Sequence, residues 1–230
     1  MKKGIEYADK SWNPITGCLN IEKGNCSVGK RCWAYGMSLR LRGRCGYDAA
    51  NPFKPTFHED KLEDPLKRKK PTVYDTCFMG DIAFAEKEWL EKVLGVIRKC
   101  PQHRFIFLTK APNKLMMNNL KFPDNCIVGV TVNNEKDVWR ISELVHHINA
   151  KYKWLSVEPM YERLNISIDG IDWLVIGAQS NPVKQPDIRW VLELMRKANH
   201  RNIPIFLKPN LTIIELTMEL PEVLKVNTNE

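Results

Sequence analysis

Short apolar runs rich in β-branched and aromatic residues alternate with longer amphipathic stretches along most of the chain. The runs are apolar at nearly every position, which is typical of parallel strands covered by helices. They predict strands at residues 15–21, 72–78, 104–109, 126–132, 153–158, 173–178 and 203–208. The amphipathic stretches predict helices at residues 33–41, 86–99, 112–120, 134–149 and 187–199.

Two of the predicted helices have an apolar face that the sequence defines. Trp33, Met37 and Leu41 follow one another at i, i+4 and i+8, so we expect them on the buried side of the first helix. Gly43 is the expected stop of that helix. In the second helix, the residues expected on one apolar side are Trp89, Val93, Val96 and Ile97.

Two segments lack this regular pattern. Residues 44–71 are rich in proline and charge, and we expect an irregular region in which 61–71 is a solvated stretch or a short helix. Residues 211–230 are expected to form a short helix and a frayed tail.

The regular order of strands and helices predicts an α/β fold, namely a partial parallel (β/α) barrel of about six or seven strands. A flat, doubly wound sheet is the alternative. No G-x-G-x-x-G pattern follows the first predicted strand, so the dinucleotide-binding fingerprint is absent. No linker divides the chain, and we expect one domain over residues 1–230.

Composition narrows the class of protein. Hydrophobic residues make up 43% of the chain without an apolar run of transmembrane length, and the N-terminus lacks the apolar stretch of a signal peptide. We therefore expect a cytoplasmic protein without a membrane partner, in which the seven cysteines are not a disulfide framework. The net charge of +8 suits an anionic partner such as nucleic acid or a phosphorylated ligand, and solubility alone is the alternative.

Polar or charged residues follow almost every predicted strand at its carboxyl end. In a parallel barrel these ends meet at one rim, where the loops carry the chemistry. Glu158 and Lys208 each follow an apolar run directly, so they either pair with each other or position a ligand. Any single polar residue could be there for solvation, but the set as a whole favours a ligand-binding rim. Its members include Gly80, Asp81, Thr109, Lys110, Thr131, Asn133, Asn134, Glu158, Gln179, Ser180, Lys208 and Asn210.

Three cysteines, Cys18, Cys26 and Cys32, follow the first predicted strand with the spacing C-x7-C-x5-C. Thiolates on one loop can converge on an iron–sulfur cluster or on zinc. Nearby Lys23, Lys30 and Arg31 favour the thiolate form.

Cys45 is a fourth candidate ligand, and a closed site of four cysteines would be structural zinc. The spacings lack the C-x2-C knuckles of typical zinc sites, and three cysteines would leave one iron of a cluster open. Cys77, Cys100 and Cys126 lie in or beside apolar segments and are expected to be core residues.

The motifs together resemble a known family. Residues 12–18 (WNPITGC), two further cysteines and residues 33–35 (WAY) are similar to the opening of the phage-associated three-cysteine-motif proteins, a radical-SAM-like group of unknown function. The resemblance covers about residues 11–210. Further matching segments, in chain order, are 78–81, 107–110, 129–132, 155–159, 173–179 and 206–208.

The resemblance implies a partial barrel of the radical SAM type, with a [4Fe–4S] cluster on Cys18, Cys26 and Cys32. S-adenosylmethionine would bind the open iron and be cleaved reductively to a 5′-deoxyadenosyl radical that modifies an unidentified substrate, such as a nucleic acid or nucleotide. A flavodoxin or ferredoxin would donate the electron, and a methyltransferase-like protein is an expected partner. Both cysteine gaps are longer here than the usual C-x3-C-x2-C of radical SAM loops and the C-x2-C common in the three-cysteine family.

The resemblance also assigns roles along the rim. Gly80 and Asp81 lie where such proteins contact the amino group of the cofactor. The other expected cofactor-binding residues are Thr109, Lys110, Thr131 and Gln179, and the expected catalytic residues are Glu158 and Lys208.

Two basic segments are candidates for nucleic-acid contact. Arg40, Arg42 and Arg44 extend from the first predicted helix, and residues 67–70 read KRKK. Both could hold phosphate groups, and the alternative for 67–70 is a solvated face. The non-catalytic alternative for the whole chain is a zinc-stabilised nucleic-acid-binding protein.

Overall fold

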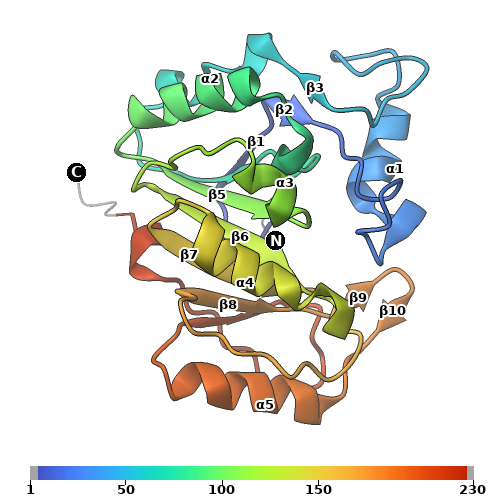
Figure 1. The fold of residues 1–230 in the computed structure, drawn as a ribbon, viewed down its shortest axis with the longest axis vertical. Coiled ribbons are helices and arrows are strands. Elements are labelled where there is room, and N and C mark those ends of the chain that lie inside the picture. The colour runs from blue at the N-terminus through green and yellow to red at the C-terminus, as the bar shows by residue number, and fades with distance from the viewer. Residues whose placement is uncertain (1–4, 227–230) are drawn as a thin grey trace.

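Seven parallel strands form the centre of the protein in a computed structural model that describes residues 5–226. Figure 1 shows the sheet, and its order is β1-β4-β5-β6-β7-β8-β11. The strands are β1 (Lys10–Trp12), β4 (Val73–Thr76), β5 (Arg104–Thr109), β6 (Cys126–Thr131), β7 (Tyr152–Val157), β8 (Trp173–Ile176) and β11 (Ile205–Leu207). Neighbours pair in chain order without the reversal that a doubly wound sheet requires. The predicted partial parallel barrel is confirmed.

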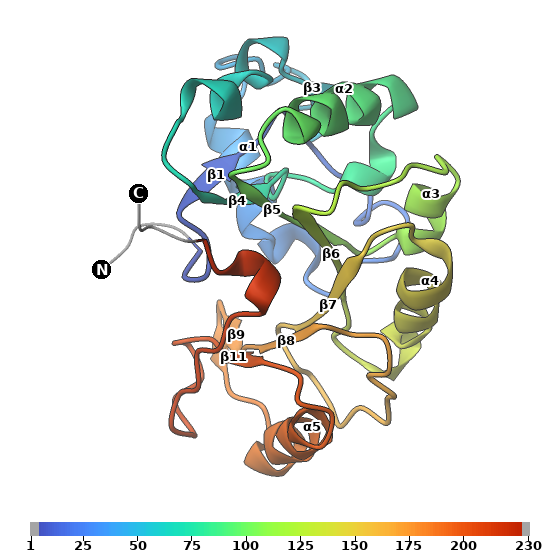
Figure 2. The ribbon, with the colours of Figure 1, turned by 90° about the vertical axis from the view of Figure 1, so that its left-hand side faces the viewer.

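Helices cover the convex face of the curved sheet, as Figure 2 shows. They are α2 (Lys87–Arg98), α3 (Pro112–Met116), α4 (Trp139–His147) and α5 (Ile188–Asn199). Each packs apolar side chains on the sheet, and the expected apolar side of α2 is confirmed by the buried Val93, Val96 and Ile97 and the partly buried Trp89. None of the helices within residues 5–226 is long and apolar enough to cross a membrane.

The concave face is filled by aromatic side chains at the amino ends of the strands. Trp154, Trp173 and Phe206 surround Tyr7, whose ring centroid lies 5.0 Å from that of Trp173. The indole of Trp154 fits only because Gly129 has no side chain, since a Cβ there would lie 2.3 Å from Nε1. The interior is therefore packed below the rim, and space for chemistry is confined to the carboxyl ends.

The expected strand at 15–21 is wrong. The first sheet strand is β1, and the chain leaves the sheet at Asn13-Pro14 because proline cannot continue the ladder. Only β2 (Ile15–Thr16) is extended beyond it, and it pairs antiparallel with β3 (Thr56–Phe57). β1 escaped detection because it is a short edge strand with two exposed residues, so it lacks an apolar run.

The expected helix after the cysteines is present as α1 (Trp33–Arg40), but its expected buried face is wrong. Trp33 is 60% exposed and Met37 is 38% exposed, whereas Ala34 and Ser38 are buried. The helix does not lie on the sheet. It sits beyond the carboxyl ends of the strands (Figure 1) and presents its small residues to the protein.

The remaining segments follow the predictions with small changes. Residues 59–67 contain two short 3-10 helices, Glu59–Lys61 and Asp64–Lys67. The helix expected at 134–149 is divided into a 3-10 turn, Glu135–Asp137, and α4. The C-terminal segment has the 3-10 helix Glu222–Leu224, while part of the predicted frayed tail, 227–230, lies outside the described residues.

Candidate functional site

A pocket of about 130 Å³ lies at the carboxyl ends of β4, β5 and β6, beneath the cysteine loop and the start of α1. It brings together residues that are up to 113 positions apart, from Cys18 to Thr131. Eight of the site residues expected from the sequence line it: Cys18, Cys26, Cys32, Gly80, Asp81, Thr109, Lys110 and Thr131. Trp33 and Phe53 from the loop side and Phe78 and Leu108 from the sheet side complete much of its apolar wall.

Two glycines in direct contact place Cys18 at this pocket. The Gly17 amide donates to the Met79 carbonyl at 3.1 Å, and the Asp81 amide donates to the Gly17 carbonyl at 3.0 Å. A Cβ on Gly80 would lie 2.2 Å from the Gly17 oxygen, and one on Gly17, whose φ is +87°, would lie 2.0 Å from the Lys54 oxygen. Only glycine allows the two backbones to approach so closely. Gly80 therefore acts here through its backbone.

Asp81 is the hydrogen-bonding centre of the site. Its Oδ1 accepts from the Thr109 hydroxyl at 2.7 Å and from the Ala83 amide at 3.0 Å. Its Oδ2 accepts from the Asn20 side-chain amide at 2.6 Å and from the Lys110 backbone amide at 2.8 Å. The carboxylate thus ties the cysteine loop to the ends of β4 and β5. Contact with the amino group of a ligand would have to replace one of these bonds.

The Cys18 sulfur receives two N–H groups from one residue. Asn20 donates its backbone amide at 3.3 Å and its side-chain amide at 3.2 Å to Sγ. Burial, followed by the charge of Asp81, raises the pKa of Cys18 to about 12. This shift favours the protonated thiol, and a metal bound there would have to replace the proton, with the two N–H groups stabilising the thiolate.

Arg140 is a site residue that the sequence analysis missed. Its guanidinium, 2% exposed, pairs with Asp137 at 2.7 Å and donates to the carbonyls of Thr131 at 2.8 Å and Asn25 at 2.7 Å. Burial lowers its pKa, and the negative charges of Asp137 and Asp81 oppose that shift. A buried cation next to the cysteine loop can offset the charge of thiolate ligands. The signal was the D-x-x-R spacing after β6, which the amphipathic pattern of α4 concealed.

Several buried polar atoms around the loop lack a partner among the described residues. They are Asn20 Oδ1, Asn134 Oδ1, Arg140 Nε and Tyr161 Oη. Buried polar groups in folded proteins are nearly always hydrogen-bonded. Because four such atoms gather near one loop, this region has the unmet bonding capacity expected of a ligand site.

Glu158 and Lys208 lie away from the cysteine pocket. Lys208 Nζ is 2.9 Å from Glu158 Oε1 and 3.5 Å from Glu6 Oε2. Glu158 follows Ser156 of β7 by two positions and Lys208 follows Phe206 of β11 by two positions, and both of these strand residues face the lumen, so Glu158 and Lys208 face it too. Burial alone would lower the pKa of Lys208, but the two carboxylates raise it. Of the two alternatives that the sequence left open, the ion pair is the one present in the structure.

Gln179 does not join either group. It begins β9 (Gln179–Ser180), which forms a hairpin with β10 (Val183–Lys184), and its side-chain amide donates to the Pro182 carbonyl at 2.8 Å. Gln179 does not line the cysteine pocket, so its position does not support the expected contact with a cofactor.

A comparison with protein families covers most of the chain. Residues 2–215 match the family described as a protein of unknown function, DUF5131. The chain belongs to this family. Neither the curated proteins nor the solved structures give a match. The DUF5131 match includes all eight pocket residues, Arg140 and the Glu158–Lys208 pair.

The cysteines of this DUF5131 protein share a pocket without being closely grouped. Within residues 5–226, no set of three or more Cys, His, Asp and Glu side chains is close enough to hold a metal ion. Cys18, Cys26 and Cys32 are partly exposed, whereas Cys77, Cys100 and Cys126 are buried as expected. Cys45 is exposed and lines a different cavity. The two N–H donors at Cys18 and the buried Arg140 beside the loop suit thiolate ligands, and the three thiols would have to come closer together to hold one metal group.

The lumen contains a buried acid whose ionisation affects stability. Asp75 is 1% exposed, accepts from the Ser11 hydroxyl at 2.8 Å, and keeps Oδ1 without a partner among the described residues. Burial raises its pKa to about 6. Between pH 4 and 6 the native state then holds a proton that the unfolded chain has lost, so stability falls as pH rises through this range.

Asp75→Asn is therefore expected to stabilise the protein above pH 6 by about 3 kcal/mol relative to its effect at pH 4, since one pKa unit corresponds to about 1.4 kcal/mol. Urea unfolding at several pH values measures this difference. The exposed Asp124→Asn is the control and should show no such trend. If Asp75→Asn changed the free energy of unfolding by the same amount at every pH, the raised pKa of Asp75 would be contradicted.

Proposed function

We propose that the protein is an iron–sulfur enzyme of the radical SAM class. One observation supports this most directly: Cys18, Cys26 and Cys32 line one pocket with the ends of three parallel strands. The resemblance in sequence motifs and the half-barrel agree with it. The substrate class we propose is a nucleic acid or nucleotide, in keeping with the net charge of +8.

The three thiols would hold a [4Fe–4S] cluster and leave one iron open. When bound, such a cluster supplies the electron that cleaves S-adenosylmethionine to methionine and a 5′-deoxyadenosyl radical, which takes a hydrogen atom from the substrate. The chain itself provides orientation and shielding. Gly17 and Gly80 fix the backbone at Cys18, Asn20 donates to its sulfur, and Arg140 balances negative charge.

The lumen side provides groups for the organic ligands. Lys110 donates to the Thr131 hydroxyl at 3.4 Å, and by alternation both lie on the same face as the Glu158–Lys208 pair. A carboxylate and an ammonium on this face can bind the amino and carboxylate groups of S-adenosylmethionine or position the substrate. The pocket of about 130 Å³ is smaller than the 300–1,000 Å³ typical of organic ligands, so the loop must open to admit the cofactor.

The thiols of such a site need a reducing compartment, which supports a cytoplasmic location. The electron would come from a flavodoxin or ferredoxin, and a methyltransferase-like protein is the proposed partner.

Anaerobic purification and reconstitution test this proposal. We expect about four irons and four sulfides per chain and a broad absorbance near about 400 nm that bleaches on reduction. The reduced protein should then cleave S-adenosylmethionine to methionine and 5′-deoxyadenosine. A reconstituted, reduced protein that neither binds nor cleaves S-adenosylmethionine would disprove it. One zinc per chain without colour would instead establish the non-catalytic zinc-stabilised alternative.

A further inference from the structure

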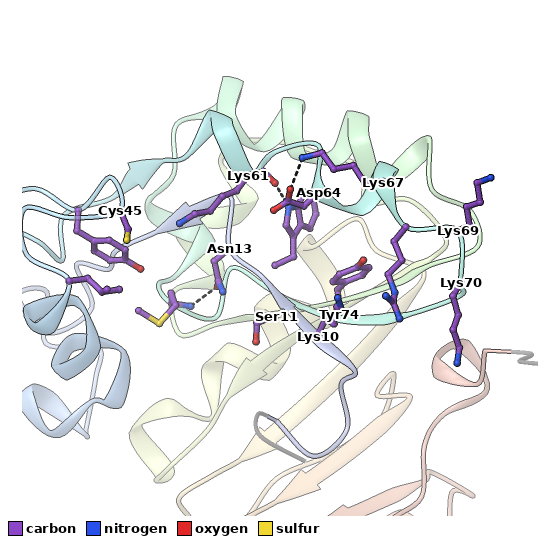
Figure 3. A pocket seen from close by; sticks show the side chains of 15 residues that line it. Lys10, Ser11, Asn13, Cys45, Lys61, Asp64, Lys67, Lys69, Lys70 and Tyr74 are labelled. Carbon is purple, nitrogen blue, oxygen red and sulfur yellow. Dashed lines mark hydrogen bonds and ion pairs between the residues drawn. The ribbon is translucent and has the colours of Figure 1, made fainter. Parts of the chain in front are cut away.

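A second cavity, of about 820 Å³, lies along the edge strand β1 (Figure 3). Lys61, Asp64 and Lys67 from the two 3-10 helices form one side of it, and Lys10, Ser11 and Tyr74 lie opposite. Cys45 marks one end, and Lys69 and Lys70 mark the other. We call this cavity the basic groove. β1 is the edge strand of the sheet and pairs only with β4, so no further strand of the described residues covers its free edge, along which the groove lies.

The basic groove is far more cationic than the chain as a whole. Six of its fifteen lining residues are Lys or Arg and one is acidic, whereas the whole chain has 35 basic and 27 acidic residues. Asp64 pairs with Lys67 at 2.9 Å, which leaves the other cations without a carboxylate within ion-pair distance among the described residues. These are Lys10, Lys61, Arg68, Lys69 and Lys70.

The other large cavities hold fewer cations without a carboxylate partner among the described residues. The cavity between α5 and the loop that carries Arg163 has three arginines, but Arg163 pairs with Glu193 at 2.8 Å and Arg189 pairs with Asp187 at 2.5 Å. A third cavity has three cations and two carboxylates, with Lys151 bound to Asp124. Among these cavities the basic groove therefore gathers the most cations without a carboxylate partner in the described part of the chain: five, against Arg196 in the second cavity and Arg98 and Arg104 in the third.

We propose that the basic groove binds the phosphate backbone of a single nucleic-acid strand. A row of unpaired cations in a channel matches a linear polyanion, because successive phosphates can each meet a lysine or arginine. An anionic membrane would be met by a flat or convex basic face, and a free phosphate would need only one or two of these cations. The volume of the groove suits a few nucleotides rather than a duplex.

The basic groove adjoins the cysteine pocket. Met79 lines the groove and its neighbour Gly80 lines the pocket. Helix α1 joins them too, since Trp33 at its start borders the pocket and Leu41 after its end borders the groove. Eight helical residues span about 12 Å, or about three to four phosphates at 3.4 Å each.

Trp33, 60% exposed at the rim of the cysteine pocket, can stack on a base of the strand that the groove holds. The strand would then be the substrate, a step that rests on the proposed function. Binding itself does not depend on the cluster.

Anisotropy of a labelled single-stranded oligonucleotide of mixed sequence, measured over a range of salt concentrations, tests the groove. We expect Lys61→Gln, Lys69→Gln and Lys70→Gln together to weaken binding about a hundredfold at about 0.1 M salt. The salt exponent is the slope of the logarithm of the binding constant against the logarithm of the salt concentration. Each lost phosphate contact on a single strand reduces its magnitude by about 0.7, so three lost contacts reduce it by about 2. The control combines Lys99→Gln, Lys121→Gln and Lys184→Gln, which are exposed and make the same charge change outside the groove.

Equal weakening in both triple variants, or an unchanged salt exponent, would overturn the proposal. So would stronger binding to a duplex of the same length or to vesicles containing phosphatidylserine. Iron content separates this result from the proposed function. The groove variant should keep its iron after reconstitution, and chelator-treated wild-type protein should still bind the oligonucleotide.

Discussion

Arg140→Met is expected to lower the free energy of unfolding by about 3–5 kcal/mol, because it leaves the buried carboxylate of Asp137 without its counter-ion. Both side chains are at most 3% exposed, so water cannot replace the lost partner. Methionine fills a similar volume, so the effect reports charge rather than a cavity. Two hydrogen bonds also disappear, including the one that holds the cysteine loop through the Asn25 carbonyl.

Chemical denaturation of wild type and variant measures this loss. Arg163→Met is the matched control, because the Arg163 side chain is 68% exposed and its pair with Glu193 is expected to contribute no more than about 1 kcal/mol. Adding Asp137→Asn to Arg140→Met should recover part of the stability by removing the unpaired charge. If Arg140→Met and Arg163→Met cost the same, the buried pair does not stabilise the site.

The central strands could be predicted closely from the sequence. The interval 104–109 coincides with β5, and 126–132 exceeds β6 by one residue. Both strands are buried on each face, so the apolar run and the strand have nearly the same ends. β1 could not be found in this way, since two of the three residues in its sequence KSW are polar and it lies at the edge of the sheet. Its position depends on the tertiary pairing of Ser11 with Asp75.

The carboxyl ends of parallel strands meet at one rim, and this rule predicted the site correctly where the strands are neighbours. Asp81, Thr109 and Lys110 come from the ends of β4 and β5, which are neighbours, and they meet around one carboxylate. The same rule grouped Glu158 and Lys208 with them, but β7 and β11 lie further round the open sheet. The rule identifies the residues at the rim. Which of them lie close to one another depends on the order of the strands and the curvature of the half-barrel, and neither can be obtained from strand ends alone.

The face of α1 shows why periodicity alone misled. Trp33, Met37 and Leu41 have helical spacing, but α1 packs against a loop, where Ala34 and Ser38 allow closer approach than large side chains would. Spacing identifies an apolar stripe, and the stripe can equally face a ligand or partner. The position of Trp33 beside the cysteine pocket favours the former.

Cys18→Ser is expected to abolish the cluster, with iron per reconstituted chain falling from about four to near zero, because serine is a poor ligand for a soft iron–sulfur site. Cys18 is the best placed of the thiols, since Asn20 donates two N–H groups to its sulfur and Asn20 is itself held by Asp81. Iron, sulfide and zinc are measured on wild type and variant after the same reconstitution. Cys32→Ser should give the same loss through a second thiol of the pocket.

Cys45→Ser is the matched control and should retain its iron. Cys45 lies in the same N-terminal region but is exposed and lines the basic groove with Lys61 and Asn13 rather than the cysteine pocket. Far-ultraviolet circular dichroism and thermal unfolding check that each variant folds, so that metal loss is not a consequence of unfolding. A four-cysteine zinc site makes the opposite prediction, since every ligand is then needed to close the coordination shell. Loss of zinc from Cys45→Ser as severe as from Cys18→Ser would therefore replace the open cluster, and its radical chemistry, with a closed structural site.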